Sequence, residues 1–121
     1  MANTILIVED EAEVRETMRD VLADEGYSVA EASNGREALD WLREHSAPCL
    51  VLLDLMMPVM SGREFLDAVK GDPSLRDVSV LVVSAMARDK LARAVADSNA
   101  KGYLTKPVQL ATLLDAVAEH C

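Results

Sequence analysis

The chain has few of the residues that keep a polypeptide extended or disordered. Only 5 glycines and 4 prolines occur among its 121 residues, and 50% of the residues are hydrophobic. This composition excludes a low-complexity or disordered chain and supplies enough apolar side chains to fill a core. We therefore predict that residues 1–121 form a single domain that folds by itself.

Long apolar runs are also missing. The longest one, residues 48–53, is much shorter than the roughly 20 residues that a membrane helix needs. The apolar stretch at residues 5–8 has no basic region before it and no cleavage site after it. These observations argue against membrane insertion and predict a cytoplasmic protein.

Cysteine and positive charge are scarce as well. The two cysteines, Cys49 and Cys121, do not have the spacing of metal ligands, and we interpret both as ordinary thiols that only pack. Lysine and arginine together number 12 against 21 aspartates and glutamates, which gives a net charge of −9. Such a chain repels a phosphate backbone, so direct binding to nucleic acid is not expected.

Five short segments have the composition of β-strands. Residues 27–32 alternate apolar or small side chains with Ser28 and Glu31, a pattern that favours an exposed edge strand. The other four segments are rich in valine, isoleucine and leucine, which is typical of strands covered on both faces in the middle of a parallel sheet. They are residues 4–8, 49–53, 78–83 and 102–104.

Helical patterns occupy the intervals between these strands. Apolar residues spaced by four predict a first helix over residues 11–25, which Gly26 would end. Asn34 can cap a second helix, and Pro107 suits the first turn of the last one. Two further helices are predicted over residues 62–70 and 88–98. Five alternating strands and helices with short connections predict an α/β fold with helices on both faces of a parallel sheet.

Polar residues follow four of the predicted strands. A doubly wound sheet of five strands can adopt the order 2-1-3-4-5, with a crevice at the carboxyl ends of strands one and three. Glu9 and Asp10 follow strand one, Asp54 follows strand three, Ser84 closes strand four, and Lys106 follows strand five. We therefore expect these side chains to meet at one rim of the sheet.

The three carboxylates at this rim indicate a metal site. They would repel one another unless one stays protonated or a cation lies among them. An oxygen-rich site with few carboxylates suits Mg²⁺, which would be held by Glu9, Asp10 and Asp54. Asp54 could then act as a nucleophile toward phosphorus, with Lys106 neutralising charge and Ser84 offering a hydroxyl.

Four motifs in these positions resemble the response-regulator receiver domain of two-component signalling. The likeness covers essentially the whole chain, with the motifs in the family's order and spacing. The motifs are residues 5–11 (ILIVEDE), 54–62 (DLMMPVMSG), 82–85 (VVSA) and 102–107 (GYLTKP). The resemblance implies a flavodoxin-like fold and a protein similar to the single-domain chemotaxis regulators.

The resemblance assigns the metal and phosphoryl chemistry to particular residues. It implies that Asp54 is phosphorylated and that Mg²⁺ is bound by Asp10, Asp54 and the backbone carbonyl of Met56. Glu9 would act on the metal through water. The family often has two aspartates where this chain has Glu9 and Asp10, and glutamate is a common variant there.

The resemblance also assigns the parts of a switch. Ser84, in place of the family's threonine, would be the switch hydroxyl, and Tyr103 the aromatic side chain that swings inward on activation. Lys106 would contact the phosphoryl group. A cis peptide bond is implied between Lys106 and Pro107, which only an X-Pro bond tolerates at low cost.

A receiver exchanges phosphate with a histidine kinase or a histidine phosphotransfer domain and signals by protein contact. We expect a signalling switch and not an enzyme, since it would catalyse only its own phosphorylation and dephosphorylation. The downstream partner could dock on the face formed by the fourth helix, fifth strand and fifth helix. The alternative is a receiver module of a larger transcription factor or hybrid kinase, whose output region is absent from this sequence.

Two other functions are disfavoured by single features. A related aspartate-dependent phosphatase needs a second acid two residues after the nucleophile, where this chain has Met56. A flavin site needs hydroxyls and amides after strand one, where residues 9–11 are acidic. Met56 and Met86 flank the predicted site, and we predict that they slow attack by water on the phosphorylated state unless they serve only as packing at the rim.

Overall fold

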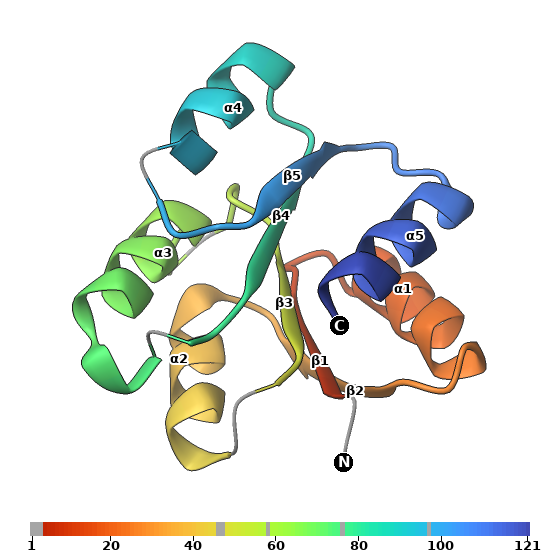
Figure 1. Ribbon diagram of the computed structural model, residues 1–121, viewed down its shortest axis with the longest axis horizontal. Coiled ribbons are helices and arrows are strands. Elements are labelled where there is room, and N and C mark those ends of the chain that lie inside the picture. Colours follow the sequence, from red (N-terminus) through yellow and green to blue (C-terminus); the bar gives the residue numbers. More distant parts are fainter. Residues whose placement is uncertain (1–3, 46–47, 58, 76, 97) are drawn as a thin grey trace.

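The computed structural model describes residues 4–45, 48–57, 59–75, 77–96 and 98–121, in which five parallel strands form one sheet between two layers of helices (Figure 1). The strand order is β2-β1-β3-β4-β5, which confirms the predicted α/β fold with a doubly wound, flavodoxin-like sheet. The strands are β1 (Thr4–Val8), β2 (Ser28–Ala32), β3 (Leu50–Leu53), β4 (Val80–Ser84) and β5 (Gly102–Thr105). The helices are α1 (Ala12–Asp24), α2 (Gly35–Glu44), α3 (Gly62–Gly71), α4 (Arg88–Ala96) and α5 (Leu110–His120), and a short 3-10 helix covers Pro73–Leu75.

Helices cover both faces of the sheet. In Figure 1, α1 and α5 lie on one side, while α2, α3 and α4 lie on the other. Successive side chains of a strand point to opposite faces, so Leu6 and Val8 of β1 enter one core, whereas Ile5 and Ile7 enter the other. The central strands are therefore buried on both faces, which is why they consist of continuous apolar runs.

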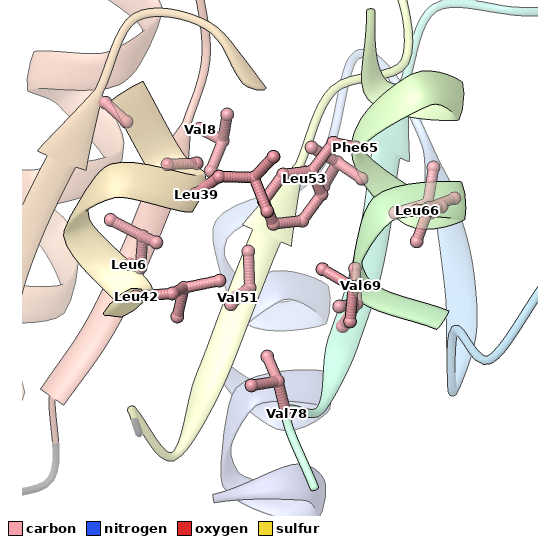
Figure 2. Packing of buried hydrophobic residues seen from close by; sticks show 14 of the residues in the cluster. Leu6, Val8, Leu39, Leu42, Val51, Leu53, Phe65, Leu66, Val69 and Val78 are labelled. Carbon is pink, nitrogen blue, oxygen red and sulfur yellow. The ribbon is translucent and has the colours of Figure 1, made fainter. Parts of the chain in front are cut away.

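The larger core lies between the sheet and the layer of α2, α3 and α4. Figure 2 shows side chains of β1 and β3 meeting those of α2 and α3 in this core. Each fully buried aliphatic or aromatic side chain contributes roughly 1.5–3 kcal/mol relative to an exposed one. The labelled contributors are Leu6, Val8, Leu39, Leu42, Val51, Leu53, Phe65, Leu66, Val69 and Val78. This packing holds β1 and β3 in a register that places Val8 beside Leu53, so the two strands end side by side.

The two edges of the sheet are β2 and β5. The exposed edge predicted for residues 27–32 is confirmed, although the strand begins at Ser28. The prediction that residues 102–104 lie in the middle of the sheet is wrong, because β5 is the other edge and all its residues are only partly buried. Its apolar composition has another cause: Tyr103 packs against one core and Leu104 against the other.

Most helix boundaries agree with the predictions. The side chain of Asn34 caps α2 by accepting a hydrogen bond from the backbone N–H of Glu37 (2.9 Å), and Gly26 follows the end of α1 with a φ of 95°. The expectation that Pro107 lies in the first turn of α5 is wrong, because the backbone is still extended at Gln109 and the helix begins at Leu110. The predicted cis bond between Lys106 and Pro107 is present. None of the described helices is long and apolar enough to cross a membrane.

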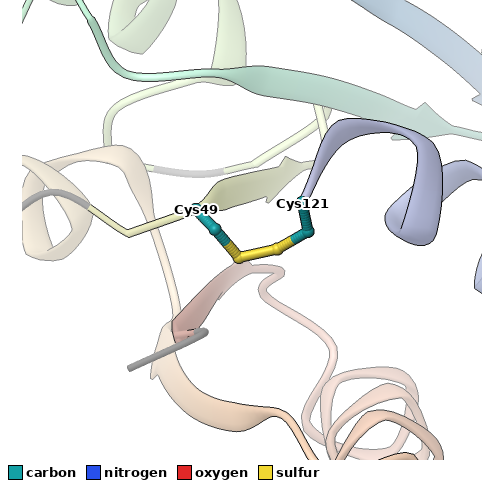
Figure 3. The surroundings of a disulfide bond; sticks show 2 residues. All are labelled: Cys49 and Cys121. Atoms are coloured by element: carbon teal, nitrogen blue, oxygen red, sulfur yellow. A yellow bond between two sulfur atoms is a disulfide. The ribbon is translucent and has the colours of Figure 1, made fainter. Parts of the chain in front are cut away.

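The two cysteines form a disulfide bond, so their interpretation as ordinary thiols is wrong (Figure 3). They are separated by 72 residues in the sequence, and their Cα atoms are 5.1 Å apart. Cys49 comes just before β3 and Cys121 just after α5. The fold brings these two positions together because α5 packs on the face of the sheet that contains Leu50.

Candidate metal and phosphoryl site

Four strands end at the same edge of the sheet, and a polar side chain stands at the end of each. Glu9 follows β1, Asp54 follows β3, Ser84 is the last residue of β4, and Lys106 follows β5. Backbone hydrogen bonds continue the ladder one step beyond the strands, from the N–H of Glu9 to Ala32 and from the N–H of Asp54 to Val8 (both 3.0 Å). These bonds fix the backbone positions of Glu9 and Asp54 at the end of the sheet, from which their carboxylates project.

The predicted acidic cluster exists. Glu9, Asp10 and Asp54 each offer a carboxylate oxygen, and these oxygens lie within 4.8 Å of one another. Glu9 and Asp54 are only 2% and 6% exposed, whereas Asp10 is exposed to solvent. Carboxylate oxygens on the border between core and solvent are the donors that Mg²⁺ prefers, and the exposed side leaves room for the waters that this ion retains. The donor set therefore fits Mg²⁺.

Lys106 lies directly against this cluster. Its Nζ donates hydrogen bonds to Glu9 Oε1 and to Asp54 Oδ2, the latter over 3.3 Å. Burial lowers the pKa of Lys106, but the hydrogen bond to Glu9 and the negative charges of Asp54 and Glu9 outweigh burial and raise the pKa above its ordinary value. The ammonium is thus charged at all physiological pH values and offsets part of the repulsion between the two buried carboxylates.

At Glu9 the effects that disfavour the charged form prevail, whereas at Lys106 the effects that favour the charged form prevail. Burial raises the pKa of Glu9, and the charge of Asp54 adds to this increase. The hydrogen bonds from Lys106 and from the backbone N–H of Glu11 (3.2 Å), and the charge of Lys106, lower the pKa without offsetting this increase. A cation in the cluster would favour the ionised form of Glu9, as Lys106 already does.

Asp54 and Met56 are also in contact. The backbone N–H of Met56 donates a hydrogen bond to Asp54 Oδ1 (3.1 Å), so each oxygen of the Asp54 carboxylate has a donor. The Met56 side chain is 60% exposed at this rim. A metal contact by the carbonyl of Met56 stays a prediction.

Ser84 lies at the same edge of the sheet as the cluster and Tyr103 lies on β5, and neither residue is part of the cluster. Ser84 is fully buried, its Oγ accepts a hydrogen bond from the backbone N–H of Met86 (3.3 Å), and its carbonyl accepts one from the N–H of Lys106 (2.8 Å). The hydroxyl is therefore at the right edge, but among the described residues no hydrogen bond joins it to Asp54. Tyr103 is half-buried and lines a pocket of about 300 Å³ with Arg88 of α4. The switch roles of Ser84 and Tyr103 stay predictions.

Sequence reasoning missed Arg15, which supports the acidic loop. Arg15 Nη1 donates a hydrogen bond to the backbone carbonyl of Glu9 (2.7 Å), and its Nε donates one to Glu31 on β2 (3.2 Å). Arg19 Nη1 contacts the other oxygen of Glu31 (3.2 Å). One signal was available: α1 begins just after the acidic residues, so a cation one turn into it lies near the loop carbonyls. The pairing of Arg15 with Glu31 on the edge strand β2 could be seen only in the folded structure.

The sheet order and the acidic edge together define a flavodoxin-like α/β domain whose candidate site lies at the topological switch point between β1 and β3. The family model for the response regulator receiver domain matches residues 5–118. The chain therefore belongs to the receiver-domain family of two-component signalling, as its motifs predicted.

Known relatives agree with this assignment over most or all of their length. The polar-differentiation response regulator DivK of Brucella anthropi is 31% identical over 120 residues, which are 99% of this chain and 97% of DivK. The chemotaxis protein CheY4 of Vibrio cholerae has a similar structure with a TM-score of 0.91, 28% identity and complete coverage of both chains. The phosphorylated cyanobacterial phytochrome response regulator RcpA has a TM-score of 0.84 at 30% identity, covering 98% of this chain and 91% of RcpA.

Proposed function

We propose that this domain is a phosphorylation switch in which Asp54 is the phosphoacceptor. One observation carries the proposal: the nearly buried carboxylate of Asp54 lies beside two further carboxylates and 3.3 Å from the Lys106 ammonium. When bound by Glu9, Asp10 and Asp54, Mg²⁺ would supply positive charge to the oxygens of a phosphoryl group.

Asp54, Lys106 and the backbone of Met56 have different roles in the proposed phosphoryl transfer. A carboxylate oxygen of Asp54 forms the new P–O bond as the P–N bond of a phosphohistidine breaks, and the departing imidazole takes up a proton from water. The Nζ of Lys106 stabilises the charge of the phosphoryl oxygens, and the backbone N–H of Met56 holds the other carboxylate oxygen in place. Positioning and charge account for most of the catalysis in such a reaction.

The donor in this proposal is a histidine kinase or a histidine phosphotransfer domain, and the output is contact with another protein. Ser84 and Tyr103 would couple phosphorylation to the α4, β5 and α5 face by favouring one of two pre-existing conformations. The chain would act in the cytoplasm as a single domain and would catalyse only its own phosphorylation and dephosphorylation. The match to DivK, which is named as a response regulator, over 97% of its length supports the role of a receiver.

Labelling with a small phosphodonor tests this proposal. With Mg²⁺ and acetyl phosphate, the wild-type protein should gain the mass of one phosphoryl group, and Asp54→Asn should gain none. Asp67→Asn changes an exposed carboxylate on α3 and should be labelled like the wild type. Equal labelling of the Asp54→Asn variant, or no labelling of the wild type, would refute the assignment of Asp54.

Met56 and Met86 should prolong the phosphorylated state. Met56 is exposed at the rim, and Met86 is half-buried with its N–H on Ser84 Oγ. Neither thioether can orient an attacking water well. Met56→Asn and Met86→Glu should each speed the decay about five- to tenfold, the value of one hydrogen bond of roughly 1 kcal/mol in the transition state. The measurement is the loss of the phosphoryl mass after the donor is removed.

Matched apolar variants serve as controls for this decay. Met56→Leu and Met86→Leu keep an apolar side chain of similar volume and should leave the lifetime unchanged. If the Asn and Glu variants decay at the wild-type rate, the two methionines only pack at the rim.

A further inference from the structure

The disulfide bond lies at the end of the sheet opposite to the acidic edge. β3 runs from Leu50, next to Cys49, to Leu53, next to Asp54, so the strand links the bond to the candidate site. The backbone N–H of Cys49 donates a hydrogen bond to Thr4, and that of Cys121 donates one to Val117 (both 2.8 Å). Both cysteines are therefore held in place by the backbone as well as by their sulfur atoms.

The fold does not require this bond. The two hydrophobic cores draw on all five strands and all five helices, and a domain of this size has enough buried surface to fold without a covalent link. The Cα atoms are 5.1 Å apart, within the range of about 4.4–6.8 Å that a disulfide spans without backbone movement. The reduced and oxidised forms can therefore share one fold.

The helix that carries Cys121 is held by few contacts. Of the α5 residues, only Leu113 and Val117 are fully buried, and the others are exposed or half-buried. Beyond Val117, Ala118, Glu119 and Cys121 are exposed and His120 is half-buried, so the disulfide adds a covalent link between this last turn and the start of β3. The covalent ring closed by the bond includes Asp54, Ser84 and Lys106, and it excludes Glu9 and Asp10.

We propose that Cys49 and Cys121 are a reversible redox site that anchors the end of α5 to β3 when oxidised. The oxidant would be a low-molecular-mass disulfide. The thiolate of the exposed Cys121 attacks one of its sulfur atoms and releases the first thiol. The thiolate of Cys49 then attacks the Cys121 sulfur, which forms the protein disulfide and releases the second thiol. The two protons that the cysteines lose are found on the two released thiols.

Thermal unfolding in defined redox buffers tests the proposal. The wild-type protein in oxidised glutathione should form an intramolecular disulfide, detected as the loss of two hydrogen masses. Its melting temperature should be about 10 °C above that of the same protein in dithiothreitol. Amide exchange in residues 118–121 should slow on oxidation, while exchange in α3 should change much less. No phosphodonor is present, so failure of the proposed phosphorylation would not affect this result.

Two single variants remove the bond from opposite sides. Cys121→Ser changes an exposed residue and should melt at the temperature of the reduced wild type in both buffers. Cys49→Ala should do the same, and Cys121→Ser alone is sufficient if Cys49→Ala does not fold. The proposal is overturned if the wild type melts at one temperature in both buffers. It is also overturned if oxidation gives only glutathione adducts or covalent dimers.

Discussion

Replacing Gly62 with alanine is expected to destabilise the domain by about 3 kcal/mol or more. A Cβ at this position would lie 2.5 Å from the Cα of Leu55 and even closer to the carbonyl oxygen of Asp54. Both are backbone atoms that follow a buried strand, so neither can move without disturbing β3. The N–H of Gly62 also donates to the carbonyl of Leu55 (3.1 Å), which holds the start of α3 close to Asp54.

The same helix offers a matched control. Gly71 ends α3, and a Cβ there would meet nothing within 4 Å. Gly71→Ala should therefore leave stability unchanged or increase it by up to about 1 kcal/mol, because alanine loses less backbone entropy on folding. Urea unfolding of the two variants gives the comparison. Equal stabilities would show that the backbone after β3 can move to accommodate the added Cβ at little cost. A stable Gly62→Ala protein with slower labelling of Asp54 would show that this backbone movement disturbs the candidate site.

Removing the charge of Lys106 is expected to make the stability of the domain depend strongly on Mg²⁺. Without Mg²⁺, Lys106→Met leaves Glu9 and Asp54 nearly buried and without their shared cation. Breaking a buried ion pair costs 3–5 kcal/mol, and we expect about 2 kcal/mol here because the Lys106 side chain is 19% exposed. Saturating Mg²⁺ should restore most of this loss, so that the ion raises the melting temperature of the variant more than that of the wild type.

The pH dependence of this effect follows from Glu9. Burial raises the pKa of Glu9 above its ordinary value of 4.5, so the folded protein retains this proton to a higher pH than the unfolded chain. Its contribution to stability is present below pH 4.5 and is lost as the pH rises through the raised pKa. Lys106 lowers the pKa of Glu9, so its removal raises that pKa further. The destabilisation of Lys106→Met should therefore increase with pH when Mg²⁺ is absent.

Calorimetry at several pH values, with Mg²⁺ or with a chelator, measures both effects. Lys101→Met removes an exposed lysine that precedes β5 and should change stability by less than about 0.5 kcal/mol under all conditions. Equal responses of the wild type and Lys106→Met to Mg²⁺ would mean that the ion and the ammonium do not share the acidic cluster.

Much of the fold could be predicted because its signals are local. Apolar runs such as residues 4–8 mark strands buried on both faces, and Asn34 marks the start of a helix by its side-chain chemistry. The acidic cluster was predictable for a related reason: the carboxyl ends of parallel strands share one edge, so Glu9 and Asp54 had to meet once the order was known.

The errors concern features that no local pattern encodes. The apolar composition of residues 102–104 is the same for a central strand and for an edge strand whose side chains pack into two cores, and only the sheet order distinguishes them. A proline after a strand is compatible with a first helical turn, but Pro107 lies in a loop and α5 begins three residues later.

The sequence by itself determined the α/β class, the receiver family and the residues that gather at the acidic edge, because strand periodicity and motif spacing are properties of neighbouring residues. Only the tertiary structure decided which distant groups form pairs. Lys106 and Glu9 are 97 residues apart, Cys49 and Cys121 are 72 apart, and Arg15 meets Glu31 across two elements. Such contacts depend on how the helices and strands pack, and that packing is fixed by the whole core at once.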